Sequence, residues 1–242
     1  MIKFLTLFIL DFFDYFHKKK IFKFLKRNNI SNLDILLDVG AHKGESIISF
    51  GKNLNIKKIY SFEASQISFK ILSKKIKDIK FKFPEMKIII ENIALGSSDK
   101  KIKIKHFNES SSSTINKINI DSNYFKKKKK FLYGSKVSKY YKEFKVKQIT
   151  LDNYLELKGI NKVDFIKIDT EGYEFEILNG LKKNIKHVKV ILFEHHYHDM
   201  IRKNYNFSDI HMFLKENNFV QIYKSKMPFR KTFEYIYKNK CY

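Results

Sequence analysis

The alternation of short apolar runs with segments of helical spacing constrains this fold more than any other feature of the sequence. Mostly apolar runs lie at 35–39, 57–62 and 87–90, and the segments 45–53 and 65–77 between them carry apolar residues at helical intervals. Strands of a parallel sheet that is covered by helices are buried on both faces, so they read as apolar runs. The first third of the chain therefore predicts a βαβαβ arrangement within an α/β fold.

The second half of the chain resumes this pattern. We expect helices at about 152–158, 173–181 and 208–217, and strands at 146–150, 163–168, 188–194, 219–223 and 232–237. The last two strands are expected to form a hairpin that caps one sheet edge. A length of 242 residues suffices for one α/β domain with a sizeable core. We therefore expect a single domain over 31–242.

The first 30 residues are expected to form an amphipathic helical segment of their own. The run 1–16 is strongly apolar, but Asp11 and Asp14 interrupt it and no small-residue cleavage site follows, so it fits neither a signal peptide nor a membrane span. A helix over about 4–24 would end in a lysine-rich turn and either pack on the domain or lie on a membrane surface. We expect packing, and peripheral contact with a membrane stays open.

A lysine-rich insertion near 108–145 separates the two halves of the domain. It begins with a serine-rich run at 108–114, and the segment 121–145 is dense in lysine and tyrosine. We expect a mobile, solvated insertion outside the sheet, and a lid over an anionic substrate is the alternative.

The formal net charge of +24 could indicate a nucleic acid, an anionic membrane or a phosphorylated substrate. The lysines are spread through every segment, and Lys, Ile, Asn, Phe and Tyr are abundant throughout, as an AT-rich genome would produce. We therefore prefer compositional bias over a dedicated polyanion site. The single cysteine, Cys241, cannot form an intrachain disulfide, so we expect a cytoplasmic protein.

The densest chemical signal is the loop at 37–45, Leu-Asp-Val-Gly-Ala-His-Lys-Gly-Glu, at a strand-to-helix junction. In an open parallel sheet, ligands bind beyond the carboxyl ends of the strands. Gly40 permits a tight turn, and Gly44 opens the helix without a side chain in the way. Glu63 ends the second strand and can accept hydrogen bonds from both ribose hydroxyls of an adenosine. The loop and this carboxylate predict an adenosine-containing ligand.

The residue types in the loop narrow the identity of this ligand. A dinucleotide fingerprint needs glycines at 40, 42 and 45, where this chain has Gly40, His42 and Glu45, and the Gly-Lys-Ser/Thr of a P-loop does not occur here. The carboxylates of Asp38 and Glu45 suit a cation, and S-adenosylmethionine carries both a sulfonium and an ammonium group. The sequence therefore predicts S-adenosylmethionine as the cofactor.

Two later strands end in polar residues at the same sheet edge. The strand at 163–168 is followed by Asp169 and Glu171, and the strand at 188–194 ends in Glu194, followed by His195, His196 and His198. We expect catalytic roles for four of these residues: Asp169, Glu171, Glu194 and His196. The plainer interpretations are that Glu171 is a charge favoured at a helix N-terminus and that the histidines are ordinary exposed side chains.

Seven short motifs occur in a fixed order over about 35–235. They are Leu-Asp-Val-Gly-Ala (37–41), Phe-Glu-Ala (62–64), Asn-Ile-Ala-Leu-Gly (92–96), Ile-Thr-Leu-Asp (149–152), Ile-Lys-Ile-Asp-Thr-Glu-Gly-Tyr-Glu (166–174), Leu-Asn-Gly (178–180) and Glu-His-His (194–196). In this order they resemble the FkbM family of methyltransferases. The resemblance implies a class I, Rossmann-like methyltransferase fold: a doubly wound, mostly parallel seven-stranded sheet with helices on both faces. It also implies S-adenosylmethionine as cofactor.

The loop and the resemblance give one set of expected cofactor-binding residues: Asp38, Gly40, His42, Gly44, Glu45, Glu63, Ala64, Asn92 and Asp169. By resemblance, Gly40 and Gly44 line the methionine end and Glu63 holds the ribose. Asn92 neighbours the adenine, and Asp169 is nearest to the transferred methyl group. His42 stands where many relatives have Asn.

The resemblance further implies methylation of a hydroxyl oxygen on a small molecule or saccharide, and we expect a sugar or nucleotide-sugar of surface polysaccharide biosynthesis. An alcohol needs activation, either by a base such as His196 or by a divalent metal ion held by Asp169, Glu194 and His196. A nucleic-acid methyltransferase is disfavoured because Asp-Thr-Glu-Gly replaces the Asn/Asp-Pro-Pro-aromatic motif that grips a flipped base. A non-enzymatic basic binding protein is disfavoured because clustered carboxylates would repel a polyanion.

Overall fold

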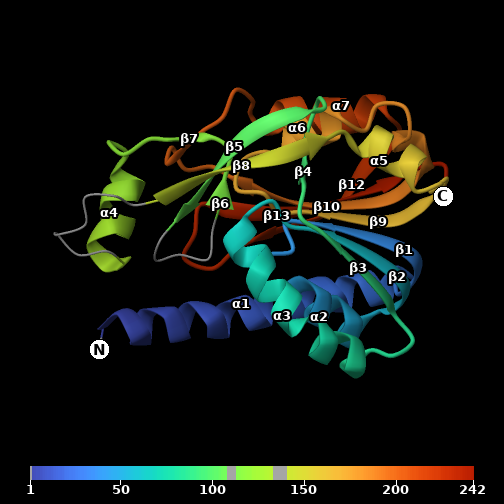
Figure 1. Ribbon diagram of the computed structural model, residues 1–242, viewed down its shortest axis with the longest axis horizontal. Coiled ribbons are helices and arrows are strands. Elements are labelled where there is room, and N and C mark those ends of the chain that lie inside the picture. Colours follow the sequence, from blue (N-terminus) through green and yellow to red (C-terminus); the bar gives the residue numbers. More distant parts are fainter. Residues whose placement is uncertain (1, 108–112, 133–140) are drawn as a thin grey trace.

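The computed structural model describes residues 2–107, 113–132 and 141–242, and shows a central sheet, helices on both of its faces and a smaller second sheet (Figure 1). Within these residues, seven strands form the central sheet in the order β12-β13-β10-β9-β1-β2-β3. Their bounds are β1 Asn32–Val39, β2 Asn55–Phe62, β3 Lys87–Glu91, β9 Val163–Ile168, β10 Val188–His196, β12 Phe219–Lys226 and β13 Thr232–Asn239.

The sheet is parallel except at one edge. The five strands from β3 to β10 run parallel, and the hairpin of β12 and β13 adds antiparallel to β10. The expected seven-stranded, mostly parallel sheet is confirmed, as is the closing hairpin. The chain order reverses direction between β1 and β9, and such a reversal opens a crevice at the carboxyl ends of the two strands.

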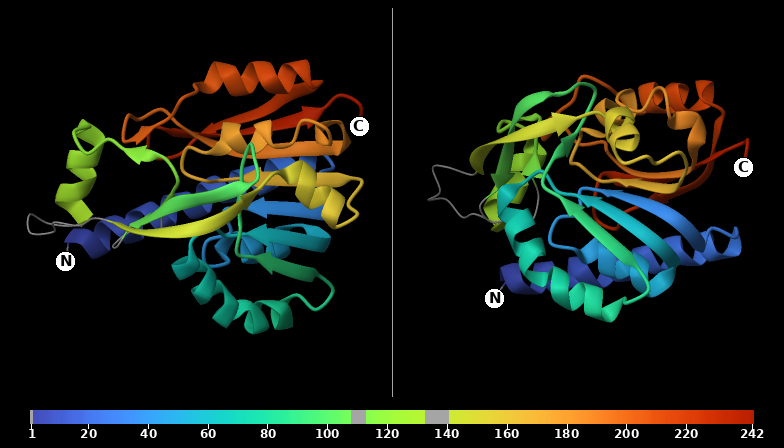
Figure 2. Two further views of the ribbon diagram at one scale, coloured as in Figure 1. Left: turned by 45° about the horizontal axis from the view of Figure 1, so that its top comes forward. Right: turned by 45° about the vertical axis from the view of Figure 1, so that its right-hand side comes forward.

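Helices cover both faces of this sheet (Figures 1 and 2). Neighbouring residues of one strand face opposite layers, because side chains alternate along a strand. Leu36 of β1 packs with the helices of one face and Leu37 with those of the other. The first face carries α1 (Ile2–Arg27), α2 (Glu45–Asn53) and α3 (Gln66–Lys82), and the second carries α5 (Leu151–Leu157), α6 (Glu174–Asn179) and α7 (Phe207–Glu216).

A four-stranded second sheet has the order β4-β8-β5-β6 in the described residues. Its strands are β4 (Ala94–Leu95), β5 (Lys100–Phe107), β6 (Ser113–Thr114) and β8 (Tyr141–Ile149). Beside it lie the short pair β7 (Lys117–Ile118) and β11 (Ile201–Arg202), and the helix α4 (Asn123–Leu132). A single 3₁₀ turn, η1 (Ile185–His187), precedes β10.

The described part of the lysine-rich insertion is more regular than we expected. α4 buries Phe125, and β8 begins at Tyr141, where it pairs with β5. Phe144 and Val146 pack against Ile104, with exposed lysines between them. The high lysine content hid this period-two pattern in the sequence. Residues 110–112 of the serine-rich run and the segment 133–140 lie outside the described residues.

α1 packs on the domain through its C-terminal half, where Ile21, Phe22 and Leu25 are buried. Two polar links also hold the helix: His17 contacts Glu234 of β13, and Arg230 donates a hydrogen bond to Asp14 at 2.8 Å. Its N-terminal end extends beyond the central sheet (Figures 1 and 2). In the described part of the chain, no helix combines the length and apolar character that crossing a membrane requires.

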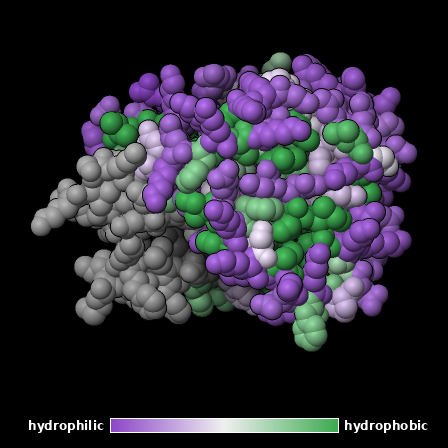
Figure 3. All heavy atoms as spheres, in the orientation of Figure 1, coloured by the Kyte–Doolittle hydropathy of each residue, from purple (hydrophilic) through white to green (hydrophobic). Residues whose placement is uncertain are grey.

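The positive charge is spread over the surface. Hydrophilic residues cover most of the face shown in Figure 3, with hydrophobic residues visible between them. Exposed lysines occur on helices of both layers, for example Lys19 on α1, Lys74 on α3 and Lys215 on α7. This distribution is what a compositional bias produces.

The second sheet and the central layer meet backbone to backbone at Gly96 and Gly180. Gly96 follows β4 and Gly180 ends α6, and a Cβ on Gly180 would lie 2.1 Å from the carbonyl oxygen of Gly96. The carbonyl oxygen of Gly180 accepts a hydrogen bond from the backbone N–H of Asp152. The space at Gly180 therefore admits no side chain without movement of the backbone.

We expect Gly180→Ala to lower the free energy of unfolding by about 1–3 kcal/mol, because overpacking against fixed backbone forces neighbouring elements apart. Urea denaturation followed by circular dichroism measures the change. Lys182→Ala, an exposed position two residues further, is the control and should change stability by at most about 0.5 kcal/mol. Equal stability of the two variants would contradict this view of the contact.

Candidate active site

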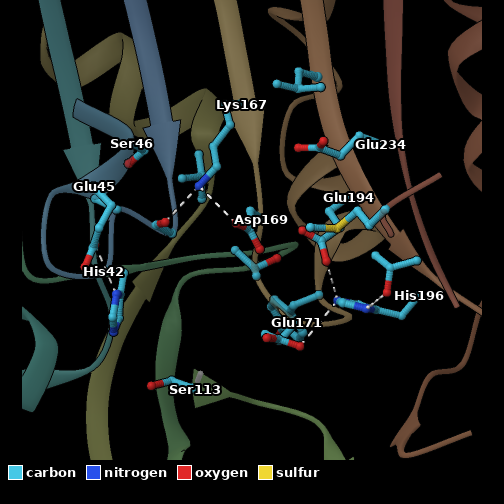
Figure 4. A pocket seen from close by; sticks show the side chains of 18 of the residues that line it. His42, Glu45, Ser46, Ser113, Lys167, Asp169, Glu171, Glu194, His196 and Glu234 are labelled. Atoms are coloured by element: carbon cyan, nitrogen blue, oxygen red, sulfur yellow. Dashed lines mark hydrogen bonds and ion pairs between the residues drawn. The ribbon is translucent and has the colours of Figure 1, made fainter. Parts of the chain in front are cut away.

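A cavity of about 840 Å³ opens at the carboxyl ends of β1, β2, β9 and β10 (Figure 4). The loop after β1, the residues 63–64 after β2, the residues 169–171 after β9 and the end of β10 line it. α1, α2, α4, the second sheet and the turn between β12 and β13 also contribute to its wall. Its volume lies in the range of ligand sites. The cavity occupies the sheet edge at which the sequence places both the cofactor and the catalytic residues.

The lining of this cavity is acidic although the chain carries a formal charge of +24. Among the described residues, seven carboxylates line it: Asp14, Glu45, Glu63, Asp169, Glu171, Glu194 and Glu234. Four lysine or arginine side chains accompany them: Lys18, Lys127, Lys167 and Arg230. Because charges act strongly where water is scarce, the cavity favours a cationic ligand.

The loop after β1 is bent by three residues in the left-handed region, Gly40 (φ 85°), His42 (φ 50°) and Gly44 (φ 92°). The backbone N–H groups of Gly40 and Ala41 both donate to the carbonyl oxygen of Phe62 at 2.9 Å. A Cβ on Gly40 would lie 1.9 Å from the carbonyl oxygen of Asp169. Gly40 therefore permits both the turn and the close approach of the loop to the end of β9.

Glu63 is a buried carboxylate on the cavity wall. It accepts hydrogen bonds from the backbone N–H groups of His42, at 2.8 Å, and Ser65, at 2.7 Å. Burial raises the pKa of Glu63 to about 7, although these two hydrogen bonds oppose the shift. A carboxylate has about four acceptor positions, so further hydroxyl donors can bind it. Ala64, beside it, also lines the cavity.

Three expected cofactor-binding residues lie behind the cavity wall. The side-chain amide of Asn92 donates to the carbonyl oxygen of Glu63 at 2.8 Å, and Asn92 does not line the cavity. A Cβ on Gly44 would meet the side chains of α3 at about 3 Å, so its glycine serves helix packing. Asp38 is fully buried. None of the three lines the cavity, which differs from the ligand contacts that we expected of them.

Lys167 is a functional residue that the sequence argument missed. Its Nζ lies 3.3 Å from Asp38 Oδ1 and 3.4 Å from Asp169 Oδ2, and it donates to the carbonyl oxygen of Gly40 at 2.9 Å (Figure 4). Burial alone would lower the pKa of Lys167, but the charges of Asp169 and Asp38 raise it above the ordinary value. A signal was present, since Lys167 interrupts an apolar strand and pairs in register with Asp38.

Glu45 holds His42 in place. Its carboxylate lies 3.1 Å from His42 Nδ1 and accepts from the backbone N–H of Lys43 at 3.0 Å. Burial opposes ionisation here, but the hydrogen bonds from His42 and from backbone N–H groups lower the pKa of Glu45 to about 2. The other ring nitrogen of His42 is buried without a hydrogen-bond partner. That nitrogen is therefore a candidate contact for a ligand.

One part of the cavity lining is a cluster of Glu171, Glu194 and His196 (Figure 4). His196 Nε2 lies 3.3 Å from Glu171 Oε2 and 3.4 Å from Glu194 Oε1. Its Nδ1 lies 3.1 Å from the hydroxyl of Thr232, which β13 places directly opposite. The structure thus brings together three of the four residues expected to be catalytic, with Asp169 on the neighbouring strand end.

Burial and neighbouring charge set the proton affinities of this cluster. Burial, together with the charges of Asp169 and Glu171, raises the pKa of Glu194 well above its ordinary value. For Asp169, burial has the same tendency, but the charges of Lys167 and His196 lower its pKa. The pKa values of these two neighbouring carboxylates are therefore shifted in opposite directions. Asp169 is kept ionised, and Glu194 holds a proton more readily. Such separation is typical of sites that move protons.

Of the other two histidines that follow Glu194, only His195 lies outside the cavity lining. His195 lies beside Lys203, 3.3 Å from its Nζ, and burial lowers the pKa of His195 to about 3. His198 lines the cavity and stacks on Tyr124 of α4, with ring centroids 4.2 Å apart. Adjacent residues of β10 point to opposite faces, so His195 and His196 cannot share a site.

The geometry gives no support to the expected metal site of Asp169, Glu194 and His196. Across the part of the chain that the structure describes, no three histidine, cysteine or carboxylate side chains are placed to hold one metal ion. The carboxylate of Asp169 is paired with Lys167 instead.

We expect Lys167→Met to lower the free energy of unfolding by about 3–5 kcal/mol, because it leaves the fully buried carboxylate of Asp38 without its cation. Urea denaturation measures this change. Lys57→Met is the control: Lys57 also contacts an aspartate, Asp34, but both side chains are exposed and solvent screens the pair. Similar stability of the two variants would show that the Lys167 interaction is dispensable.

Solved structures of methyltransferases share this fold. The methyltransferase FkbM from Methylobacillus flagellatus KT is 15% identical, with a TM-score of 0.54 over 86% of this chain and 44% of that one. Magnesium protoporphyrin IX methyltransferase from Synechocystis PCC 6803 with bound SAM is 8% identical, with a TM-score of 0.53 over 95% of this chain and 81% of that one. TrmK from M. capricolum in complex with S-adenosyl-homocysteine is 13% identical, with a TM-score of 0.50 over 93% and 68%.

At these identities the structures show the fold alone, which is that of class I methyltransferases. The chain spans less than half the length of the M. flagellatus protein. A search of curated proteins gave no match. The sequence itself matches the family model described as "Methyltransferase FkbM domain" over residues 38–220, which include the four strand ends that line the cavity. The chain therefore belongs to the FkbM methyltransferase family.

Proposed function

We propose that this protein is an S-adenosylmethionine-dependent O-methyltransferase that acts on a hydroxyl group of a sugar or nucleotide-sugar. The observation that carries the proposal is a single cavity whose wall joins the loop after β1 and Glu63 to the cluster of Glu171, Glu194 and His196. Family membership supports methyl transfer. Two proteins of similar fold hold S-adenosylmethionine or its product, which supports the cofactor.

The chemistry of the lining fits this cofactor. Seven carboxylates suit its sulfonium and ammonium groups, and Glu63 has acceptor positions left for the ribose hydroxyls. When bound, S-adenosylmethionine supplies a methyl group that its sulfonium sulfur already activates. The residues 40–42 would hold its methionine end, Glu63 would hold the ribose, and Asp169 would lie beside the methyl group.

The remaining task of the protein is to align the acceptor and remove its proton. A sugar hydroxyl is weakly acidic, so a base must take the proton as the new carbon–oxygen bond forms. We assign this role to His196 Nε2, which Thr232 orients from the other side of the ring. Glu171, the more exposed of its two carboxylate neighbours, stabilises the imidazolium that results.

The lining also suits a polyhydroxylated acceptor. Carboxylates and imidazoles can accept hydrogen bonds from several hydroxyl groups, and Lys18, Lys127 and Arg230 can pair with the phosphates of a nucleotide-sugar. A nucleic acid is favoured by the net charge of +24, but the acidic lining would repel its closely spaced phosphates. The site therefore supports the sugar acceptor better.

Affinity for S-adenosylmethionine should increase as the pH rises through about 7. Glu63 has a pKa of about 7 in the free protein, and its ionised form accepts hydrogen bonds from both ribose hydroxyls. Titration calorimetry at several pH values measures this dependence. In Glu63→Gln, we expect affinity to fall by about 10- to 100-fold at pH 8, since each charge-assisted hydrogen bond contributes about 1.5–3 kcal/mol. The variant should also lose the pH dependence in this range.

Glu91→Gln is the matched control for this experiment. Glu91 ends the next strand, β3, and contacts Lys158 without lining the cavity. It should bind the cofactor with unchanged affinity. If Glu63→Gln binds with wild-type affinity, the assignment of Glu63 to the ribose is wrong. If the unaltered protein does not bind S-adenosylmethionine, the assignment of the cofactor is wrong.

His196→Ala should lower kcat for an accepted sugar by about 10²- to 10⁴-fold, the usual contribution of a general base. Transfer of labelled methyl groups to a panel of monosaccharides and nucleotide-sugars identifies the acceptor and gives the rates. Glu171→Gln should reduce kcat by less than His196→Ala.

Two measurements distinguish a general-base role of His196 from a structural role. His196→Ala should retain affinity for S-adenosylmethionine, and His187→Ala, on η1 and outside the cavity lining, should retain full kcat. A chelator should leave the rate unchanged; loss of activity that Mg²⁺ restores would return the divalent metal to the mechanism. Full activity of both Asp169→Asn and His196→Ala would move the chemistry away from this cluster.

A further inference from the structure

We infer that the outer face of α1, with the turn that carries Phe229, docks on an anionic lipid bilayer. This docking face consists of the exposed side chains Phe12, Phe13, Tyr15, Phe16, Lys19, Lys20, Lys23, Lys26 and Arg27 of α1, together with Phe229. The inference is independent of the methyl-transfer chemistry.

Aromatic side chains from two distant parts of the chain meet at one end of this face. Phe13 contacts Phe229 edge to face, with ring centroids 5.0 Å apart, and Phe12 contacts Phe16 at 4.9 Å. Phe229 is 73% exposed and Phe12 is 51% exposed. Soluble proteins rarely expose grouped apolar side chains of this size unless the surface binds a partner.

Cations continue the same helix face toward the C-terminus of α1. Residues three or four positions apart share one face of a helix, so Phe12, Phe16, Lys19 and Lys23 form one row. Every lysine and arginine of the helix from residue 18 onward is exposed. Aromatic rings followed by a basic face are typical of helices that lie in the interface of an anionic membrane.

The inner side of α1 is fixed, so the docking face must point outward. His17 contacts Glu234, Asp14 pairs with Arg230, and Ile21 and Leu25 are buried. The polar links hold the middle of the helix, next to the aromatic side chains. The exposed rings are therefore a permanent feature of the folded domain.

The docking face borders the cavity. Asp14 and Lys18 of α1 and Phe229 of the turn between β12 and β13 all line it. A bilayer against the docking face would therefore lie beside the cavity wall that α1 and this turn form.

Its positive charge makes the docking face a better match for an anionic lipid surface than for a second copy of the chain. Two copies that met through this face would bring two sets of lysines together, which is repulsive. An anionic headgroup layer instead neutralises the lysines while the aromatic rings enter the boundary with the acyl chains.

The test is cosedimentation with vesicles of phosphatidylcholine alone and of equal parts phosphatidylcholine and phosphatidylglycerol. We expect binding to the anionic vesicles and little to the neutral ones. Lys19→Glu/Lys23→Glu should weaken binding by at least about tenfold, because it replaces attraction to the anionic headgroups by repulsion. Phe12→Ser/Phe16→Ser should weaken it by a similar factor through lost apolar burial.

Matched controls lie on other parts of the surface. Lys182→Glu/Lys215→Glu changes the net charge by the same amount, and Met212→Ser removes an exposed apolar side chain from α7. Both should bind vesicles as the unaltered protein does. A charge control that loses binding equally would show general attraction by a basic protein and overturn the docking face.

A second measurement does not require variants with weakened vesicle binding. The chain has no tryptophan, so Phe229→Trp introduces a single one at the docking face. Its emission should shift to the blue with anionic vesicles, as an indole that enters the lipid boundary does. An unchanged spectrum, or self-association that Phe12→Ser/Phe16→Ser abolishes in the absence of vesicle binding, would overturn the proposal.

Discussion

A buried cation between two carboxylates holds the two halves of the site together. Lys167 of β9 contacts Asp38 of β1 and Asp169 beyond its own strand, and it donates to the carbonyl oxygen of Gly40. The crevice of the sheet opens between these two strands. The loop after β1 and the end of β9 are therefore held by the same charge, and removal of that charge would leave the buried carboxylate of Asp38 unpaired.

The charge of the surface and the charge of the cavity have opposite signs. Screening confines the influence of exposed lysines to about 10 Å at ordinary salt, whereas carboxylates in the cavity act through a less polar medium. The basic surface can attract an anionic carrier or bilayer, and the acidic lining selects a cationic cofactor. The lysines at the edge of the cavity, Lys18 and Lys127, lie where these two regions meet.

The inner and outer sides of α1 carry different residues and have different roles. Its inner side completes the cavity wall through Asp14 and Lys18 and is tied to β13 through His17. Its outer side carries aromatic and basic side chains that nothing in the described chain covers, apart from the contact with Phe229. The helix that closes the site can thus also orient it relative to a surface.

The amino-acid sequence by itself determined the α/β class, the mostly parallel sheet and the sheet edge at which the polar residues gather, because apolar periodicity and glycine turns are local signals. It also carried the family motifs that the comparison confirmed. It did not separate residues that touch the cavity from residues that support it. Asn92 and Gly44 lie behind the wall, and Lys167 and Arg230 lie on it. Only the tertiary structure decided these positions, because the direction of a side chain at a strand end depends on the packing of elements that are distant in the sequence.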